Sequence, residues 1–111
     1  MKGTNLGELE ELILLTVGVL YDDAYGVAIQ DYLERECDRT ATISTIHVVL
    51  HRLEEKGYLD SRLDGASSER GGRRKLLFTL TKSGKAAILE ARAMRDQLWK
   101  AIPKAVFNYA S

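Results

Sequence analysis

Residues 42–84 read TISTIHVVLHRLEEKGYLDSRLDGASSERGGRRKLLFTLTKSG, and the first part of this stretch has the pattern of an amphipathic helix. Four apolar residues recur at the spacing of one helical face: Ile46, Val49, Leu50 and Leu53. The hydroxyl of Thr42 can cap the start of this helix, and Gly57 suits the left-handed residue that follows its end. The stretch therefore predicts a helix over residues 43–56.

A β-hairpin is predicted directly after this helix. Residues 58–63 alternate in the manner of a strand, and residues 74–80 place Leu76, Phe78 and Leu80 on one face. Residues 64–72 between them are polar and contain glycine, and they are too many for a tight turn. The connection is therefore expected to project as a loop.

The two ends of the chain also show helical spacing. Apolar residues predict helices over residues 6–20, 24–36 and 82–101, and Pro103 is expected to disturb the end of the last one. Three helices, a hairpin and a long final helix follow one another in the order of a winged helix-turn-helix. The predicted fold class is therefore mainly helical (α+β), with a two-stranded wing and a C-terminal helix.

Size and charge limit what this chain can do. Its 111 residues allow one domain, and 45% hydrophobic residues are enough for a small core. The net charge of zero combines an acidic region, with eight acids and two bases in residues 1–36, and a basic one, with six bases and no acid in residues 70–85. The basic region can face phosphate. A single cysteine rules out an intrachain disulfide, and we expect a cytoplasmic protein without a signal peptide or membrane segment.

The helix over residues 43–56 is the predicted reader of double-stranded DNA. In a helix-turn-helix the second helix enters the major groove, which is about 12 Å wide, with its N-terminal half. This half offers neutral hydrogen-bonding groups, and residues 70–75 of the loop offer cations and glycines that suit phosphate or the minor groove. We predict contacts to base edges from Thr45, His47, Val48 and His51, and contacts to phosphates from Thr42, Ser44, Arg52, Arg70, Arg73, Arg74 and Lys75.

The last helix is predicted to form a homodimer. Its apolar residues suit packing against another helix: Ile88, Ala91, Met94, Leu98, Trp99 and Ile102. The domain of residues 1–81 can fill its core without all of them, so residues 82–111 are interpreted as a dimerisation helix and tail within the same compact unit. Packing against the chain's own first helix is the alternative. Trp99 is also a candidate for binding a flat effector at the interface.

The sequence resembles the PadR family of transcriptional regulators over nearly its whole length. The similar segments are residues 6–10 (LGELE), 24–26 (AYG), 53–59 (LEEKGYL), 71–75 (GGRRK) and 78–84 (FTLTKSG). The resemblance implies a homodimeric regulator, often a repressor, that binds a two-fold operator and dimerises through its C-terminal helix. It also implies that a small aromatic effector can release DNA. Where the family commonly has Ser-Pro-Gly-Thr-Leu-Tyr-Pro, residues 42–48 read TISTIHV, so the operator sequence does not carry over.

Other functions fit this sequence less well. A winged-helix module that binds a protein partner instead of DNA is the main alternative, and the acid-free residues 70–85 argue against it. His47 and His51 share a helix face, but no glutamate lies between them and a metal site is not expected. No nucleophile elbow, phosphate-binding loop or zinc quartet is present, so neither catalysis nor a cofactor is expected.

Overall fold

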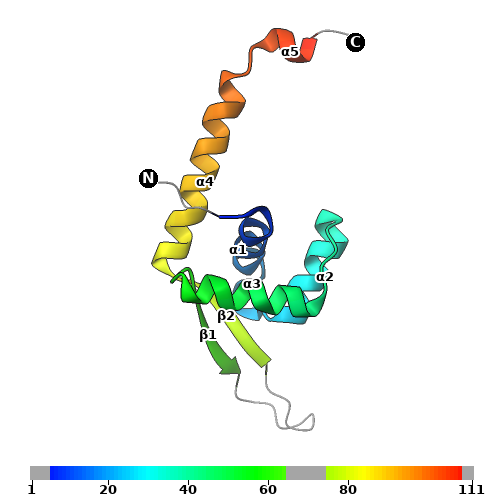
Figure 1. Cartoon of the computed structure of the whole chain (residues 1–111), viewed down its shortest axis with the longest axis vertical. Coiled ribbons are helices and arrows are strands. Elements are labelled where there is room, and N and C mark those ends of the chain that lie inside the picture. Colours follow the sequence, from blue (N-terminus) through cyan, green and yellow to red (C-terminus); the bar gives the residue numbers. More distant parts are fainter. Residues whose placement is uncertain (1–5, 65–74, 109–111) are drawn as a thin grey trace.

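The structure is a computed structural model, and it describes residues 6–64 and 75–108. In chain order the elements are α1 (Glu8–Leu20), the 3-10 helix η1 (Tyr21–Asp23), α2 (Gly26–Cys37), α3 (Ile43–Glu55), β1 (Leu59–Asp64), β2 (Lys75–Leu80), α4 (Lys82–Ala101) and α5 (Lys104–Asn108). The first three α-helices and the hairpin form one body, from which the second half of α4 projects (Figure 1). This arrangement confirms the predicted winged-helix fold.

The core lies where α1, α2, α3 and β2 meet. Its largest fully buried side chains include Ile13, Leu14, Ile29, Ile46, Leu50, Leu53 and Phe78. All four apolar residues of the predicted stripe on α3 are buried, with exposed fractions of 5% or less. The stripe therefore fixes α3 by its apolar side and leaves the other side of the helix to solvent.

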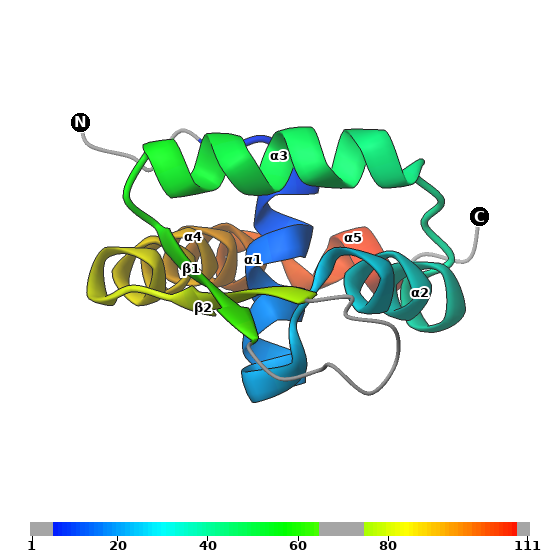
Figure 2. The ribbon, with the colours of Figure 1, turned by 90° about the horizontal axis from the view of Figure 1, so that it is seen from below.

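The hairpin pairs its two strands antiparallel, from Leu59 opposite Leu80 to Asp64 opposite Lys75. The backbone N–H of Phe78 also donates a 2.8 Å hydrogen bond to the carbonyl oxygen of Ala24, just before α2. Figure 2 shows the hairpin, here called the wing, beside α3 at the end of the molecule opposite the projecting part of α4. The wing and α3 thus present one common end of the molecule.

The boundaries of three predicted elements need correction. α1 begins at Glu8 rather than residue 6, because Gly7 has extended backbone and serves as its N-cap. α2 begins at Gly26 rather than residue 24, because Ala24 pairs with β2 and Tyr25 is extended. β1 runs one residue later than predicted, and the short helix α5 after Pro103 was not predicted.

The first turn of α1 holds three other segments in place through ion pairs. The positive end of the helix dipole favours carboxylates in this turn, and in the structure they also bind cations that are distant in sequence. The pairs are Glu8 with Arg39 at 2.7 Å, Glu10 with Lys56 at 3.0 Å and Glu11 with Arg95 at 2.7 Å. Three of the eight acids in residues 1–36 are therefore engaged in contacts with distant parts of the fold.

No single helix in the described part of the chain is both long and apolar enough to cross a membrane.

Candidate nucleic-acid interface

The start of α3 is capped as predicted. Thr42 is the N-cap, and its hydroxyl accepts a hydrogen bond from the Thr45 N–H at 3.1 Å. The first turn of α3 contains no acidic residue, so its free amides and the positive end of the helix dipole can face an anion. Gly57 closes the other end of the helix with a φ of 85°, also as predicted.

Four predicted DNA-binding residues form one exposed strip on α3: Ser44, Thr45, Val48 and Arg52. Together with the start of α1 they line an open groove of about 750 Å³. Val48 is 55% exposed although it is apolar, and nothing in the described residues covers it. Glu8 also lines this groove, but Arg39 holds its carboxylate and lowers its pKa, first through their hydrogen bond. The strip combines hydroxyls, a methyl-bearing side chain and a guanidinium.

The two histidines lie beside this strip and pack against the fold. The rings of His47 and His51 are stacked, with centroids 6.4 Å apart, and the edge of His51 meets Phe78 at 6.2 Å. His47 is half-buried against Gly26 at the start of α2. The structure therefore separates the predicted base-contacting residues: Thr45 and Val48 lie on the strip, and His47 is half-buried against α2. His51 stays 57% exposed, although its ring contacts those of His47 and Phe78. Residues 6–64 and 75–108 contain no cluster of three or more metal-ligating side chains.

The base of the wing is attached to the start of α2. The Lys75 ammonium lies 4.3 Å from the centroid of the Tyr25 ring, which is a cation–π contact. Of the four predicted basic residues of the wing, Lys75 is in the described part of the chain, whereas Arg70, Arg73 and Arg74 lie outside it. Lys75 therefore joins the wing to the helix-turn-helix.

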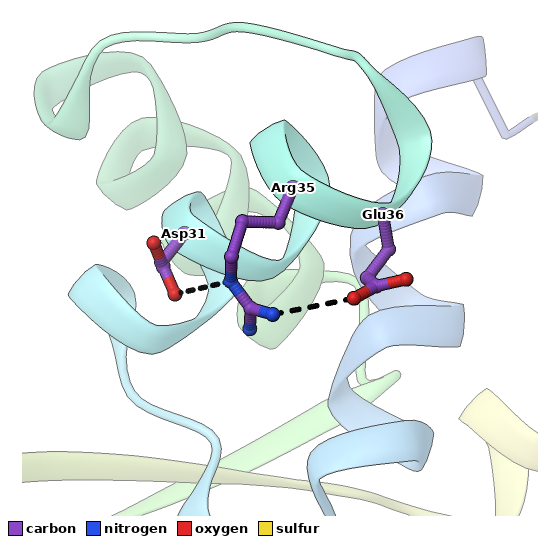
Figure 3. Close-up of polar contacts among 3 residues, drawn as sticks. All are labelled: Asp31, Arg35 and Glu36. Atoms are coloured by element: carbon purple, nitrogen blue, oxygen red, sulfur yellow. Dashed lines mark hydrogen bonds and ion pairs between the residues drawn. The ribbon is translucent and has the colours of Figure 1, made fainter.

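The outer face of α2 differs in charge from α3. Arg35 is the only cation of α2, and Figure 3 shows its guanidinium between two carboxylates. It donates to Asp31 at 2.9 Å and to Glu36 at 3.2 Å, and the hydrogen bond to Asp31 is the main reason why the pKa of Arg35 is raised. A helix whose single cation is held between two carboxylates has less to offer phosphate than α3 and the wing, so these two elements make up the candidate interface.

The predicted dimer residues on α4 divide into two groups. Ile88 packs against the core of its own chain, and Ala91 is buried there. Further along the same helix the side chains are uncovered: Met94 is 54% exposed, Leu98 63%, Trp99 66% and Ile102 36%. These four residues are called the projecting stripe. The Trp99 ring lies 5.6 Å from that of Phe107 on α5, a contact that sequence reasoning did not anticipate because it could not place residues beyond Pro103.

Comparisons with known proteins agree with this architecture. The model of the "Transcriptional regulator PadR-like family" matches residues 13–90. A solved structure of Bacillus subtilis PadR in complex with operator DNA is 26% identical with a TM-score of 0.61; the alignment covers 86% of this chain but 49% of that one. A PadR family regulator from Clostridium difficile is 26% identical with a TM-score of 0.64, over 92% of this chain and 96% of that one. RosR of H. salinarum, at 18% identity and a TM-score of 0.71, covers 93% of this chain and 86% of its own, and shows the fold alone. No curated protein sequence gave a significant match.

Proposed function

The chain belongs to the PadR-like family of transcriptional regulators, and we propose that it is a repressor that binds a specific DNA site as a homodimer. Membership in this family places the chain among regulators rather than enzymes. The observation that carries the DNA-binding proposal is the exposed strip of Ser44, Thr45, Val48 and Arg52 on α3, a helix whose first turn has no acidic residue. In the related structure from B. subtilis the PadR protein is in complex with operator DNA, which supports the same role here.

The strip has the chemistry that reading a major groove requires. Ser44 and Thr45 can exchange hydrogen bonds with base edges or phosphates, and the exposed methyls of Val48 suit the methyl group of thymine. Arg52 lies one turn beyond Val48 and two turns beyond Thr45, where a guanidinium can reach phosphate or guanine. The wing stands next to α3, so its basic residues Arg70, Arg73, Arg74 and Lys75 are proposed to contact the adjacent backbone or minor groove.

The projecting stripe supports the homodimer. Gly84, Ala87 and Ala91 of α4 are buried against their own chain, and Met94, Leu98 and Ile102 continue the same side of the helix beyond the body. An apolar strip of this kind is normally covered by a partner. Two copies joined there would present two α3 helices to successive major grooves, about 34 Å apart, on a site with two-fold symmetry. A dimer bound at such a site over a promoter would exclude the polymerase.

Binding to promoter DNA tests the proposed function directly. Fluorescence anisotropy would compare the DNA upstream of the protein's own gene with a shuffled duplex over a salt series. Tight binding to the promoter, at least tenfold better than to the shuffled duplex, is the expected result. A protein that binds neither duplex at low salt would instead favour the alternative function, a winged-helix module for a protein partner.

Arg52→Ala is expected to weaken binding to promoter and shuffled DNA about equally. An Arg52 side chain that contacts phosphate releases counterions from the DNA. Its loss therefore makes the plot of log affinity against log salt concentration less steep by about one per lost contact. Arg92→Ala is the matched control, because Arg92 is an exposed arginine on α4, away from α3 and the wing. If Arg52→Ala kept the salt slope of the control, α3 would not lie along the DNA backbone as proposed.

A small aromatic effector is proposed to bind at Trp99. Trp99 belongs to the projecting stripe, and its exposed indole lies next to Phe107 of α5. A dimer formed at the stripe would therefore enclose aromatic surfaces that suit a flat ligand. Trp99 is the only tryptophan, so its fluorescence reports this position alone. Titration with planar aromatic compounds is expected to quench Trp99 and to lower promoter affinity in parallel. Compounds that lower promoter affinity without any change in Trp99 fluorescence would place the effector elsewhere.

A further inference from the structure

Residues 24–26 (AYG) are a joint at which α2, α3 and the wing meet. The carbonyl oxygen of Ala24 accepts from the Phe78 N–H, and the Tyr25 ring lies under the Lys75 ammonium. Gly26, the next residue, is buried against His47 of α3. Ala24 and Tyr25 thus contact the wing, whereas Gly26 contacts α3.

Gly26 leaves room for the His47 ring. A Cβ atom at position 26 would lie 2.7 Å from His47 Cε1 and 2.8 Å from His47 Nε2, which is closer than atoms of this kind approach in proteins. The backbone of Gly26 does not require glycine, since the only positive-φ glycine in the described residues is Gly57. Alanine would be the better helix former at this first position of α2. The reason for glycine here is therefore the space that it gives to His47.

The contacts continue from His47 and return to the joint. His47 stacks on His51, the edge of His51 meets the Phe78 ring, and the Phe78 backbone is bound to Ala24. The His47 ring is therefore in contact with Gly26 on one side and with the His51 ring on another. The remaining, half-exposed part of the ring lies on α3 next to the exposed residue Ser44, which is three positions earlier on the helix.

We propose that Gly26 and His47 form a positioning pair that sets the sequence preference of α3. This inference rests on the proposed DNA-binding function. Gly26 lets the His47 ring lie back against α2, so that its exposed edge occupies one fixed place beside the strip of Ser44, Thr45 and Val48. A side chain held in one orientation discriminates between bases better than one that moves freely. His47 therefore acts through its fixed orientation, and Gly26 acts through His47 without touching DNA.

A double-mutant cycle with Gly26→Ala, His47→Ala and the combined variant tests this pair. The preferred site is first obtained by selecting the wild-type protein against a pool of randomised duplexes. Gly26→Ala is expected to lower the preference for that site over shuffled DNA at least tenfold, because the displaced ring enters the strip. Its affinity for shuffled DNA and its salt slope should stay near the wild-type values. Gly18→Ala is the matched control, since a Cβ there meets Leu80 Cδ1 at 3.4 Å.

If Gly26→Ala folds poorly, the stability of the combined variant still tests whether residues 26 and 47 act as a pair. Removing the imidazole frees the space for the new methyl group, so the combined variant is expected to be more resistant to urea than Gly26→Ala, while its site preference stays low. A combined variant no more stable than Gly26→Ala would overturn the pairing of these residues. Wild-type site preference in a folded Gly26→Ala protein would overturn the effect on specificity. A wild-type protein that selects no duplex would refute the DNA-binding function itself, whereas the urea measurements would still report on the pair.

Discussion

Leu98→Asp is expected to turn the proposed dimer into a folded monomer and to weaken promoter binding roughly 100-fold or more. Leu98 is 63% exposed in the single chain and lies two helical turns beyond Ala91, on the side of α4 that packs against the body. In the proposed dimer this side is buried, and an unpaired carboxylate there carries a large desolvation cost. Two half-sites can then no longer be bound by one particle, which removes the gain in affinity from bivalency.

The matched control for Leu98→Asp is Leu89→Asp. Leu89 is 67% exposed, on the same helix, and nine residues away, which is about two and a half turns and therefore the opposite side. Both variants place the same charge on α4 at a similarly exposed leucine. Sedimentation velocity should show a monomer for Leu98→Asp and a dimer for Leu89→Asp, with the same circular dichroism for both. If Leu98→Asp sedimented as the wild-type dimer, the projecting stripe would not be the interface.

The elements that the sequence predicted well are those whose structure is determined by residues nearby in the chain. The apolar stripe of α3, the hydroxyl cap at Thr42 and the left-handed Gly57 all depend on neighbours within a few residues, and the structure confirms each of them. The hairpin was also predictable, since alternation and a polar connection mark it. By contrast, the start of α2 was misplaced because Ala24 is bound by Phe78, which is 54 positions later in the chain.

The candidate site was predicted less completely because its arrangement depends on tertiary contacts. The sequence showed that Thr45, His47, Val48 and His51 lie on the outer side of one helix. It did not show that Gly26 would meet His47 and Phe78 would meet His51, or that Ser44, Thr45, Val48 and Arg52 would line one groove. A buried glycine in the N-terminal turn of a helix was the available signal, since helix propensity alone gives no reason for it.

The ion pairs of α1 were hidden for a similar reason. The helix dipole alone is enough to explain each carboxylate at the start of α1, so the sequence pattern does not indicate that a cation binds it. The cations that bind Glu8, Glu10 and Glu11 are 31, 46 and 84 positions away. Only the packed fold brings these carboxylates and cations together. The pair of Glu10 and Lys56 is expected to affect stability most, because Glu10 is the most buried of the three carboxylates.

Lys56→Met is expected to lower the free energy of unfolding by about 2–3 kcal/mol at pH 7. The Glu10 side chain is 9% exposed, and Lys56 Nζ donates to both of its carboxylate oxygens at 3.0 Å. Methionine keeps most of the apolar length of lysine but leaves a buried carboxylate without its counter-charge. Urea unfolding at a fixed protein concentration measures the loss, because the stability of the proposed dimer would depend on concentration.

The pH dependence identifies the cause of this loss. Burial alone would raise the pKa of Glu10. The hydrogen bond from the Gly7 N–H, the hydrogen bond and charge of Lys56 and the charge of Arg52 together outweigh burial and lower that pKa. A lowered pKa gives stability that is present above the ordinary carboxyl pKa of about 4.5 and lost as the pH falls through the folded-state value. The difference between wild type and Lys56→Met should therefore be largest near pH 7 and should shrink steadily below about pH 4.5.

Arg35→Met is the control for this last experiment, because it removes the same kind of contact from the surface of α2. The Arg35 side chain is 57% exposed, and both of its carboxylate partners can return to water when it is lost (Figure 3). Exposed pairs of this kind contribute little to stability, so its urea midpoint should match that of the wild type. A loss of the same size in Arg35→Met and Lys56→Met, unchanged from pH 7 to pH 3.5, would mean that side-chain packing rather than the buried charge of Glu10 explains the effect.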